Sequence, residues 1–91
     1  MKDLYEVYIV ETMSGKLYTG IAKDADKRFD EHLNDKRKGA KFFRSDPPKK
    51  ILFRENGQNR SEASKLEARI KKLSRAKKIE LISGSLKSSD I

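Results

Sequence analysis

The stretch that decides the fold is EVYIVETMSGKLYTG, residues 6–20. Two short runs of residues, each reaching one residue beyond an end of this stretch, have side chains that alternate between two faces of an extended chain. Such alternation is typical of half-buried β-strands. In the first run Tyr5, Val7 and Ile9 alternate with Glu6, Tyr8 and Val10, and in the second Leu17, Thr19 and Ile21 alternate with Tyr18 and Gly20. Two such runs separated by turn residues predict a β-hairpin.

The loop of this hairpin determines where its two polar aromatic residues point. A three-residue loop, Met13-Ser14-Gly15 with Gly15 at a positive φ, would bring Tyr8 and Tyr18 out on the same face. A two-residue Ser14-Gly15 turn would place the two tyrosines on opposite faces. The sequence predicts the hairpin and leaves these alternatives open.

A helix is expected to follow the hairpin, with Asp24 as its N-cap and its end near Asn34. The apolar residues in and just before this segment recur at helical spacing, at Ala22, Ala25, Phe29 and Leu33. Arg28 and His32 are four residues apart and therefore share one face beside that apolar stripe. Hairpin and helix together predict a cleft that contains two phenols, one guanidinium and one imidazole.

The second half of the sequence predicts one more strand and two helices. After a turn at Pro47-Pro48, residues 49–55 form a candidate strand with Ile51 and Phe53 on one face, ended by Asn56-Gly57. Asn59 is a candidate N-cap with Glu62 three residues later, and Ser74 is expected to begin a last short helix. The first of these helices has an apolar stripe at Ala63, Leu66, Ile70 and Leu73. Residues 1–83 are thus expected to form one domain, and 84–91 have the composition of a disordered tail.

Composition restricts the class of protein and of partner. The chain has 91 residues, no cysteine and a formal charge of +8. The absence of cysteine excludes disulfides and thiolate metal sites, and no long apolar run or signal-peptide pattern is present, so we expect a soluble, cytoplasmic protein with no membrane partner. Residues 1–35 carry a net −3 and residues 36–91 a net +11. Such a basic half indicates a polyanionic partner, most commonly nucleic acid, although solubility charge is an alternative.

The segment 36–44 surrounds Phe42 and Phe43 with basic residues, a pattern that fits a nucleic-acid backbone clamp with a stacking aromatic ring. Buried core phenylalanines are the alternative. The residues that we predict to contact nucleic acid are all cationic: Lys23, Lys36, Arg37, Lys38, Lys41, Arg44, Lys49, Lys50 and Lys71.

The two tyrosine-containing strands, Arg28 and a later helical Glu67 together resemble the GIY-YIG nuclease domain, particularly its small single-domain branch. The resemblance extends from about Tyr5 to Ile82. It implies an α/β fold with a small, mainly antiparallel three-stranded sheet flanked by helices. The chain differs from several relatives at Ile21, where they have a lysine three residues after the second tyrosine.

The resemblance also implies roles for individual residues. Glu67 would hold Mg²⁺ or Mn²⁺, Arg28 would stabilise charge on the phosphate, and Tyr18 would act as the base with Tyr8 as its partner. His32 would hydrogen-bond the scissile phosphate or the nucleophile.

The residue pattern alone allows structural roles for the same side chains. At about 100° per residue, Glu67 lies at the margin of the buried stripe, where it could instead pair with Lys71 or form a capping box with Ser64. Arg28 could pair with Asp24 or Glu31 on its own helix. The tyrosines could simply be half-buried strand residues, and His32 could be structural.

Three functional hypotheses follow. The first is a metal-dependent endonuclease that hydrolyses the phosphodiester bonds of DNA rather than RNA. A metal-activated water would attack the phosphate, a tyrosine would act as the base, and a protein partner is a potential source of substrate specificity. The second is a nucleic-acid-binding module on the same scaffold without turnover. The third is a basic protein-interaction domain. Metal-dependent nicking separates the first from the second, and salt-sensitive nucleic-acid binding separates the second from the third.

Overall fold

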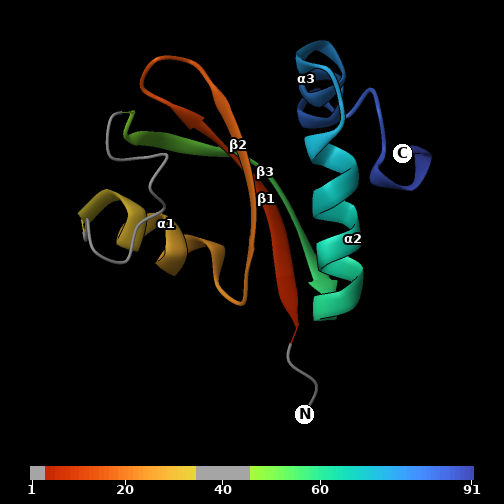
Figure 1. Cartoon of the computed structure of the whole chain (residues 1–91), viewed down its shortest axis with the longest axis horizontal. Coiled ribbons are helices and arrows are strands. Elements are labelled where there is room, and N and C mark those ends of the chain that lie inside the picture. Colours follow the sequence, from red (N-terminus) through yellow and green to blue (C-terminus); the bar gives the residue numbers. More distant parts are fainter. Residues whose placement is uncertain (1–3, 35–45) are drawn as a thin grey trace.

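The computed structural model describes residues 4–34 and 46–91. Its elements are β1 (Tyr5–Thr12), β2 (Leu17–Ala22), α1 (Ala25–Asn34), β3 (Pro48–Gln58), α2 (Arg60–Lys71), α3 (Arg75–Ser83) and a 3₁₀ turn, η2 (Ser88–Asp90). The strands form one antiparallel sheet in the order β2-β1-β3. Helix α1 lies on one side of this sheet, and α2 and α3 lie on the other (Figure 1). The predicted α/β architecture is confirmed. None of the helices in the described parts of the chain is long and apolar enough to cross a membrane.

The hairpin between β1 and β2 has the three-residue loop. The backbone N–H of Thr12 donates to the carbonyl oxygen of Lys16 at 2.9 Å, and Gly15 takes a φ of +92°. In the resulting register Tyr8 is opposite Gly20 and Tyr18 is opposite Val10. Because Tyr8 and Val10 are two residues apart on one strand, Tyr8 and Tyr18 share a face of the sheet.

Each face of the sheet has its own hydrophobic core. On the side of α2 and α3, the buried core residues are Val7, Ile9, Ala63, Leu66, Ile70 and Leu81. On the side of α1, Tyr8, Val10 and Ala25 are buried, with Phe29 packed against them. The predicted alternation of β1 is therefore confirmed, and the central strand is covered on both faces, as its almost unbroken burial requires.

The prediction that Ile51 and Phe53 share a face is wrong. Phe53 pairs with Ile9 and packs in the core beneath α2, whereas Ile51 pairs with Val10 and packs in the core beneath α1. The register between β1 and β3 shifts between Ile9 and Val10, so β3 contains one extra residue there. Such a bulge reverses the side-chain alternation locally. The strand is also longer than expected, because it starts at Pro48 and continues through Asn56-Gly57 to Gln58.

The helices begin where the sequence predicts. The backbone N–H of Lys27 donates to Asp24 at 3.1 Å, that of Glu62 donates to Asn59 at 2.8 Å, and that of Lys77 donates to Ser74 at 3.2 Å. These side chains satisfy N–H groups that have no partner within their own helix. Since α2 begins at Arg60, Ser64 lies inside the helix and does not cap it.

Residues 84–91, whose composition favours disorder, are folded back against the domain in this structure. Gly84 ends α3 with a φ of +89°, which favours glycine. The hydroxyl of Ser88 donates to a carboxylate oxygen of Glu55 at 2.6 Å, and Ile91 packs against the core beneath α2. These contacts were not visible in the sequence because they join segments that are far apart along the chain.

Candidate active site

Tyr8 lies at the centre of the candidate site. Its side chain is 2% exposed, and its ring crosses the backbone of Gly20 on the neighbouring strand. A Cβ atom at position 20 would lie 2.8 Å from the phenolic oxygen of Tyr8 and 3.3 Å from a ring carbon of Tyr18. Contacts below 3.0 Å are essentially never tolerated by a real Cβ. The missing side chain of Gly20 therefore makes room for both phenols.

Three further groups act electrostatically on the phenol of Tyr8. They are Tyr18 of β2, Arg28 of α1 and Glu67 of α2, and Arg28 also forms a side-chain hydrogen bond with it. Helix α2 covers the opposite face of the sheet, but it packs against β2, which is an edge strand. A side chain at the margin of its buried stripe can therefore influence groups beyond that edge. The fold thus gathers Tyr18, Arg28 and Glu67 around the phenol of Tyr8, and together these are four of the five residues expected at the site.

The environment of Tyr8 fixes its protonation state. Burial is the largest effect, and together with the neighbouring Tyr18 and Glu67 it raises the pKa of Tyr8 to about 12, although Arg28 acts in the opposite direction. A phenol with such a pKa is neutral at physiological pH and can donate a hydrogen bond. Tyr8 is therefore poorly suited to remove a proton.

We expect this pKa to be visible in an ultraviolet titration. The difference in phenolate absorbance between the wild type and Tyr8→Phe should have its midpoint near pH 12, compared with about 10 for a free tyrosine. Because the folded state holds this proton more tightly than the unfolded state, the stabilisation is complete below about pH 10 and is lost as the pH rises towards 12. A rise of two pKa units corresponds to about 2 to 3 kcal/mol in the free energy of unfolding. A midpoint at or below pH 10 while circular dichroism still reports a folded protein would contradict this environment.

Arg28 is positioned by the way in which α1 is anchored to the sheet. The backbone N–H of Ala25, in the first turn of the helix, donates to the Glu6 carboxylate on β1 at 2.7 Å. Three residues later Arg28 is partly exposed, 3.8 Å from a carboxylate oxygen of Glu31. It also lines a hollow of about 380 Å³ with Lys23, Lys27 and Glu31. The predicted pairing with Glu31 is thus present, together with the hydrogen bond to Tyr8.

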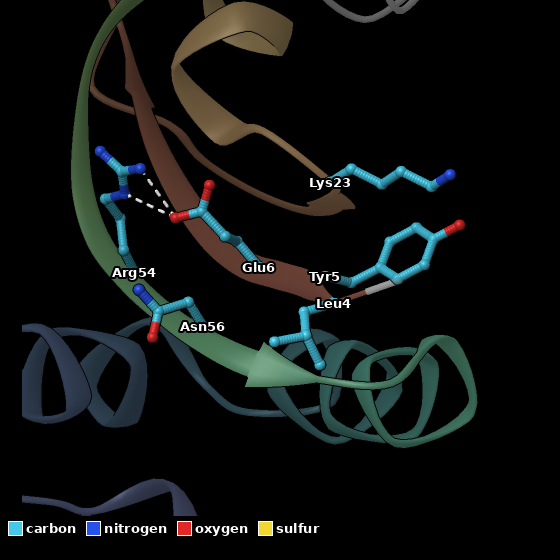
Figure 2. A pocket seen from close by; sticks show the side chains of 6 residues that line it. All are labelled: Leu4, Tyr5, Glu6, Lys23, Arg54 and Asn56. Carbon is cyan, nitrogen blue, oxygen red and sulfur yellow. Dashed lines mark hydrogen bonds and ion pairs between the residues drawn. The ribbon is translucent and has the colours of Figure 1, made fainter. Parts of the chain in front are cut away.

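Glu6, which is buried, and Arg54, which is exposed, form an anchor that the sequence analysis did not identify. Two guanidinium nitrogens of Arg54 donate to Glu6 Oε1 at 3.0 and 2.7 Å, and a third nitrogen donates to Asp26 on α1 at 2.9 Å. Arg54 and Glu6 line a hollow of about 410 Å³. Figure 2 shows Arg54 turned towards Glu6, with Lys23 and Tyr5 extending away from this pair. The sequence feature that could have indicated this anchor is Glu6 itself, because it lies on the same strand face as Tyr8 and Val10, where an apolar residue is expected. This anchor fixes α1, and therefore Arg28, relative to Tyr8.

Glu67 is half-buried, with a side chain that is 22% exposed. Its carboxylate lies 3.3 Å from the ammonium group of Lys71, so the pair predicted from the helix spacing is present. Among the described residues, no group of three or more His, Cys, Asp or Glu side chains could hold a metal ion. A single carboxylate nevertheless fits Mg²⁺, which keeps several waters and commonly binds one or two carboxylates together with substrate phosphate oxygens.

Comparison with known proteins identifies the family of this chain. The profile of the GIY-YIG catalytic domain matches residues 4–80. The chain belongs to the GIY-YIG family. Among its relatives, the UPF0213 protein of Staphylococcus saprophyticus is 43% identical over 81 residues, which cover 89% of this chain and 96% of that protein. The UPF0213 protein of Desulfotalea psychrophila is 46% identical over 81 residues, which cover 89% of this chain and 73% of that protein.

A solved structure is also similar. The solution NMR structure of a UPF0213 protein from Bacillus halodurans has a TM-score of 0.55 and 36% sequence identity, and the match covers 88% of this chain and 83% of that one. Membership of the GIY-YIG family implies nuclease activity and nucleic-acid binding in general, and the family is generally dependent on divalent metals.

The remaining expected site residues of this GIY-YIG domain are distributed as follows. Lys23 is exposed and lies 5.9 Å from the centre of the Tyr5 ring. Lys49 and Lys50 are exposed on β3, and Lys71 pairs with Glu67. His32 is part of α1, but its side chain lies outside the described structure. Five predicted nucleic-acid contacts, together with Phe42 and Phe43, also lie outside the described residues: Lys36, Arg37, Lys38, Lys41 and Arg44.

Proposed function

We propose that this GIY-YIG domain is a metal-dependent endonuclease that hydrolyses phosphodiester bonds, with DNA as the substrate to be tested first. The observation that carries the proposal is the convergence on Tyr8 of Tyr18, Arg28 and Glu67 from three different elements. A phenol, a permanent cation and a carboxylate are the groups that such a hydrolysis needs for proton transfer, charge stabilisation and metal binding.

The two tyrosines would have different tasks. Tyr8 keeps its proton, since its pKa is raised to about 12, and it would donate a hydrogen bond to the phosphate or to Tyr18. Tyr18 is less buried than Tyr8 and lies on the same face of the sheet, so it would accept the proton of the attacking water. Because a free phenol titrates near pH 10, this role requires a nearby positive charge.

Arg28 and Glu67 would supply the electrostatic part of the reaction. The guanidinium of Arg28 can contact two phosphate oxygens at once and would hold the phosphate as its negative charge increases. Glu67 would hold Mg²⁺ or Mn²⁺, and a divalent cation placed there would add Lewis-acid stabilisation of the phosphate. Lys71 would have to release Glu67 for this purpose, because the two side chains are 3.3 Å apart.

Plasmid nicking with and without Mg²⁺ or Mn²⁺ tests the proposal. We expect metal-dependent nicking by the wild type, loss of nicking in Tyr18→Phe, and a milder reduction in Tyr8→Phe. Tyr5→Phe is the matched control, because Tyr5 is the third tyrosine and packs on the other face of the sheet. It should cleave at the wild-type rate.

A wild-type protein that cleaves no DNA or RNA with either metal, while it still binds nucleic acid, would favour the binding module without turnover. Equal rates for Tyr18→Phe and Tyr5→Phe would instead remove Tyr18 as the base and leave the nuclease function standing.

A further inference from the structure

A second hollow lies between the start of β2 and helix α3. Its volume is about 270 Å³, and it is lined by Lys16, Leu17, Arg75 and Lys78. Figure 1 shows α3 at the same end of the molecule as the β1–β2 turn. Three cations from two segments that are far apart in the sequence thus line one hollow, and no carboxylate among the described residues lines it. We call these three cations and Leu17 the basic cleft.

The charges of the basic cleft are poorly compensated. Within residues 4–34 and 46–91, no carboxylate forms an ion pair with Lys16, Arg75 or Lys78. Asp46 is the carboxylate that Lys16 influences, but its oxygens accept hydrogen bonds from Ser14 and Thr12, which hold its pKa below the ordinary value. Glu80, on α3, pairs with Lys77 at 3.6 Å.

Three like charges around one hollow repel each other, and Lys78 is half-buried, which reduces its exposure to water and salt. An anion placed in the cleft would remove this repulsion. Leu17 adds an apolar contact surface but no negative charge. The chemistry of the cleft therefore favours a phosphate group over a neutral ligand.

The position of the cleft relative to the candidate active site points to the source of that phosphate. Lys16 precedes Tyr18 by two residues, which corresponds to roughly 7 Å along an extended strand, and it precedes Gly20 by four, or roughly 13 Å. A nucleic-acid strand presents one phosphate per about 3.4 Å of helix axis. A strand that lies along the β2 edge with one phosphate beside Tyr18 would therefore bring another phosphate, a few nucleotides away, to the basic cleft.

We propose that the basic cleft of Lys16, Arg75 and Lys78 binds a backbone phosphate of the nucleic-acid substrate, a few nucleotides from the bond that is cut. This inference rests on the proposed nuclease function, because that function places the nucleic-acid strand beside Tyr18 and along β2. It places the substrate along β2 and across the start of α3, on residues that the sequence analysis did not identify as nucleic-acid contacts.

Binding measured without divalent metal tests the cleft independently of cleavage. The full chain carrying Lys16→Gln, Arg75→Gln and Lys78→Gln is compared with a control carrying Arg60→Gln, Lys65→Gln and Lys87→Gln. Both variants lose one arginine and two lysines, and none of the control residues lines the cleft. Fluorescence anisotropy with a short labelled DNA duplex and a single strand, over a series of salt concentrations, gives the affinity and its salt dependence.

We expect the cleft variant to lose at least about tenfold more affinity than the control. Its slope of log affinity against log salt should also fall by about 0.9 for each phosphate contact that is lost. Equal affinities and slopes for the two variants would overturn the cleft and leave the nuclease proposal intact. A wild type that binds no nucleic acid even at low salt would overturn both.

A second measurement guards against misfolding of the triple variant. Titration of the wild-type protein with the same DNA, followed by amide NMR shifts, should perturb the signals of Leu17, Arg75 and Lys78 with the same midpoint as the overall binding. Binding without shifts at these residues would also overturn the proposal.

Discussion

Replacing Glu67 with alanine should reduce metal-dependent nicking below detection while leaving nucleic-acid binding intact or tighter. Glu67 acts electrostatically on Tyr8, and its loss would remove the carboxylate that we propose to hold the cation beside Tyr8, Tyr18 and Arg28. The same change removes a negative charge next to the substrate and frees Lys71, which now lies 3.3 Å from Glu67, to approach phosphate. The two effects are measured separately, by nicking with Mg²⁺ and by anisotropy in a chelator.

Glu62→Ala is the matched control for this variant. Glu62 also lies on α2 and also pairs with a lysine, at 3.6 Å from Lys65, so the change in charge is the same. Its nicking rate should equal that of the wild type. Nicking by Glu67→Ala at the wild-type rate would show that the metal is held elsewhere, and the assignment of Glu67 would be abandoned.

Replacing Arg28 with alanine should lower the rate of cleavage by about a hundredfold or more, as is usual when a positioned donor to a developing negative charge is lost. Arg28→Lys should restore little of this activity, because an ammonium group cannot form the same planar, two-pronged contact with a phosphate. Arg28 also lowers the pKa of Tyr8 through its charge and hydrogen bond, so in either variant the phenol of Tyr8 should titrate differently from that of the wild type.

Arg69→Ala, an exposed arginine on α2, controls for the loss of a positive charge and should cleave within a fewfold of the wild-type rate. Single-turnover rates at saturating substrate separate the effect on chemistry from the effect on binding. Equal rates for Arg28→Ala and Arg69→Ala would mean that Arg28 serves α1 through Glu31 and has no part in the reaction.

The local features of the fold could be predicted because they depend on neighbouring residues. The caps at Asp24, Asn59 and Ser74 each arise from one side chain acting within a few residues. The three-residue loop, in which Gly15 has a positive φ, is one of the two alternatives that the sequence leaves open. The common face of Tyr8 and Tyr18 follows from the same loop, because strand alternation carries the effect of the loop along both strands.

The features that could not be predicted depend on pairing between distant segments. The bulge that separates Ile51 from Phe53 belongs to the pairing of β3 with β1, and nothing within residues 49–55 specifies it. The anchor between Glu6 and Arg54 joins the first strand to the third and fixes a helix that lies between them in the sequence. Only the unusual position of Glu6, on an otherwise apolar strand face, gave any local sign of this contact.

The crossing of Tyr8 over Gly20 also has a consequence for how this protein tolerates mutation. At most positions an active site is lost when a functional group is removed. At position 20 the addition of a single methyl group is enough to disrupt the site, since the phenolic oxygen of Tyr8 lies 2.8 Å from where that methyl would be. A variant with alanine there would retain both phenols, the guanidinium and the carboxylate, yet Tyr8 would have to leave its place among them. In surveys of natural variation, position 20 should therefore be intolerant of every other amino acid, although its residue takes no part in the chemistry.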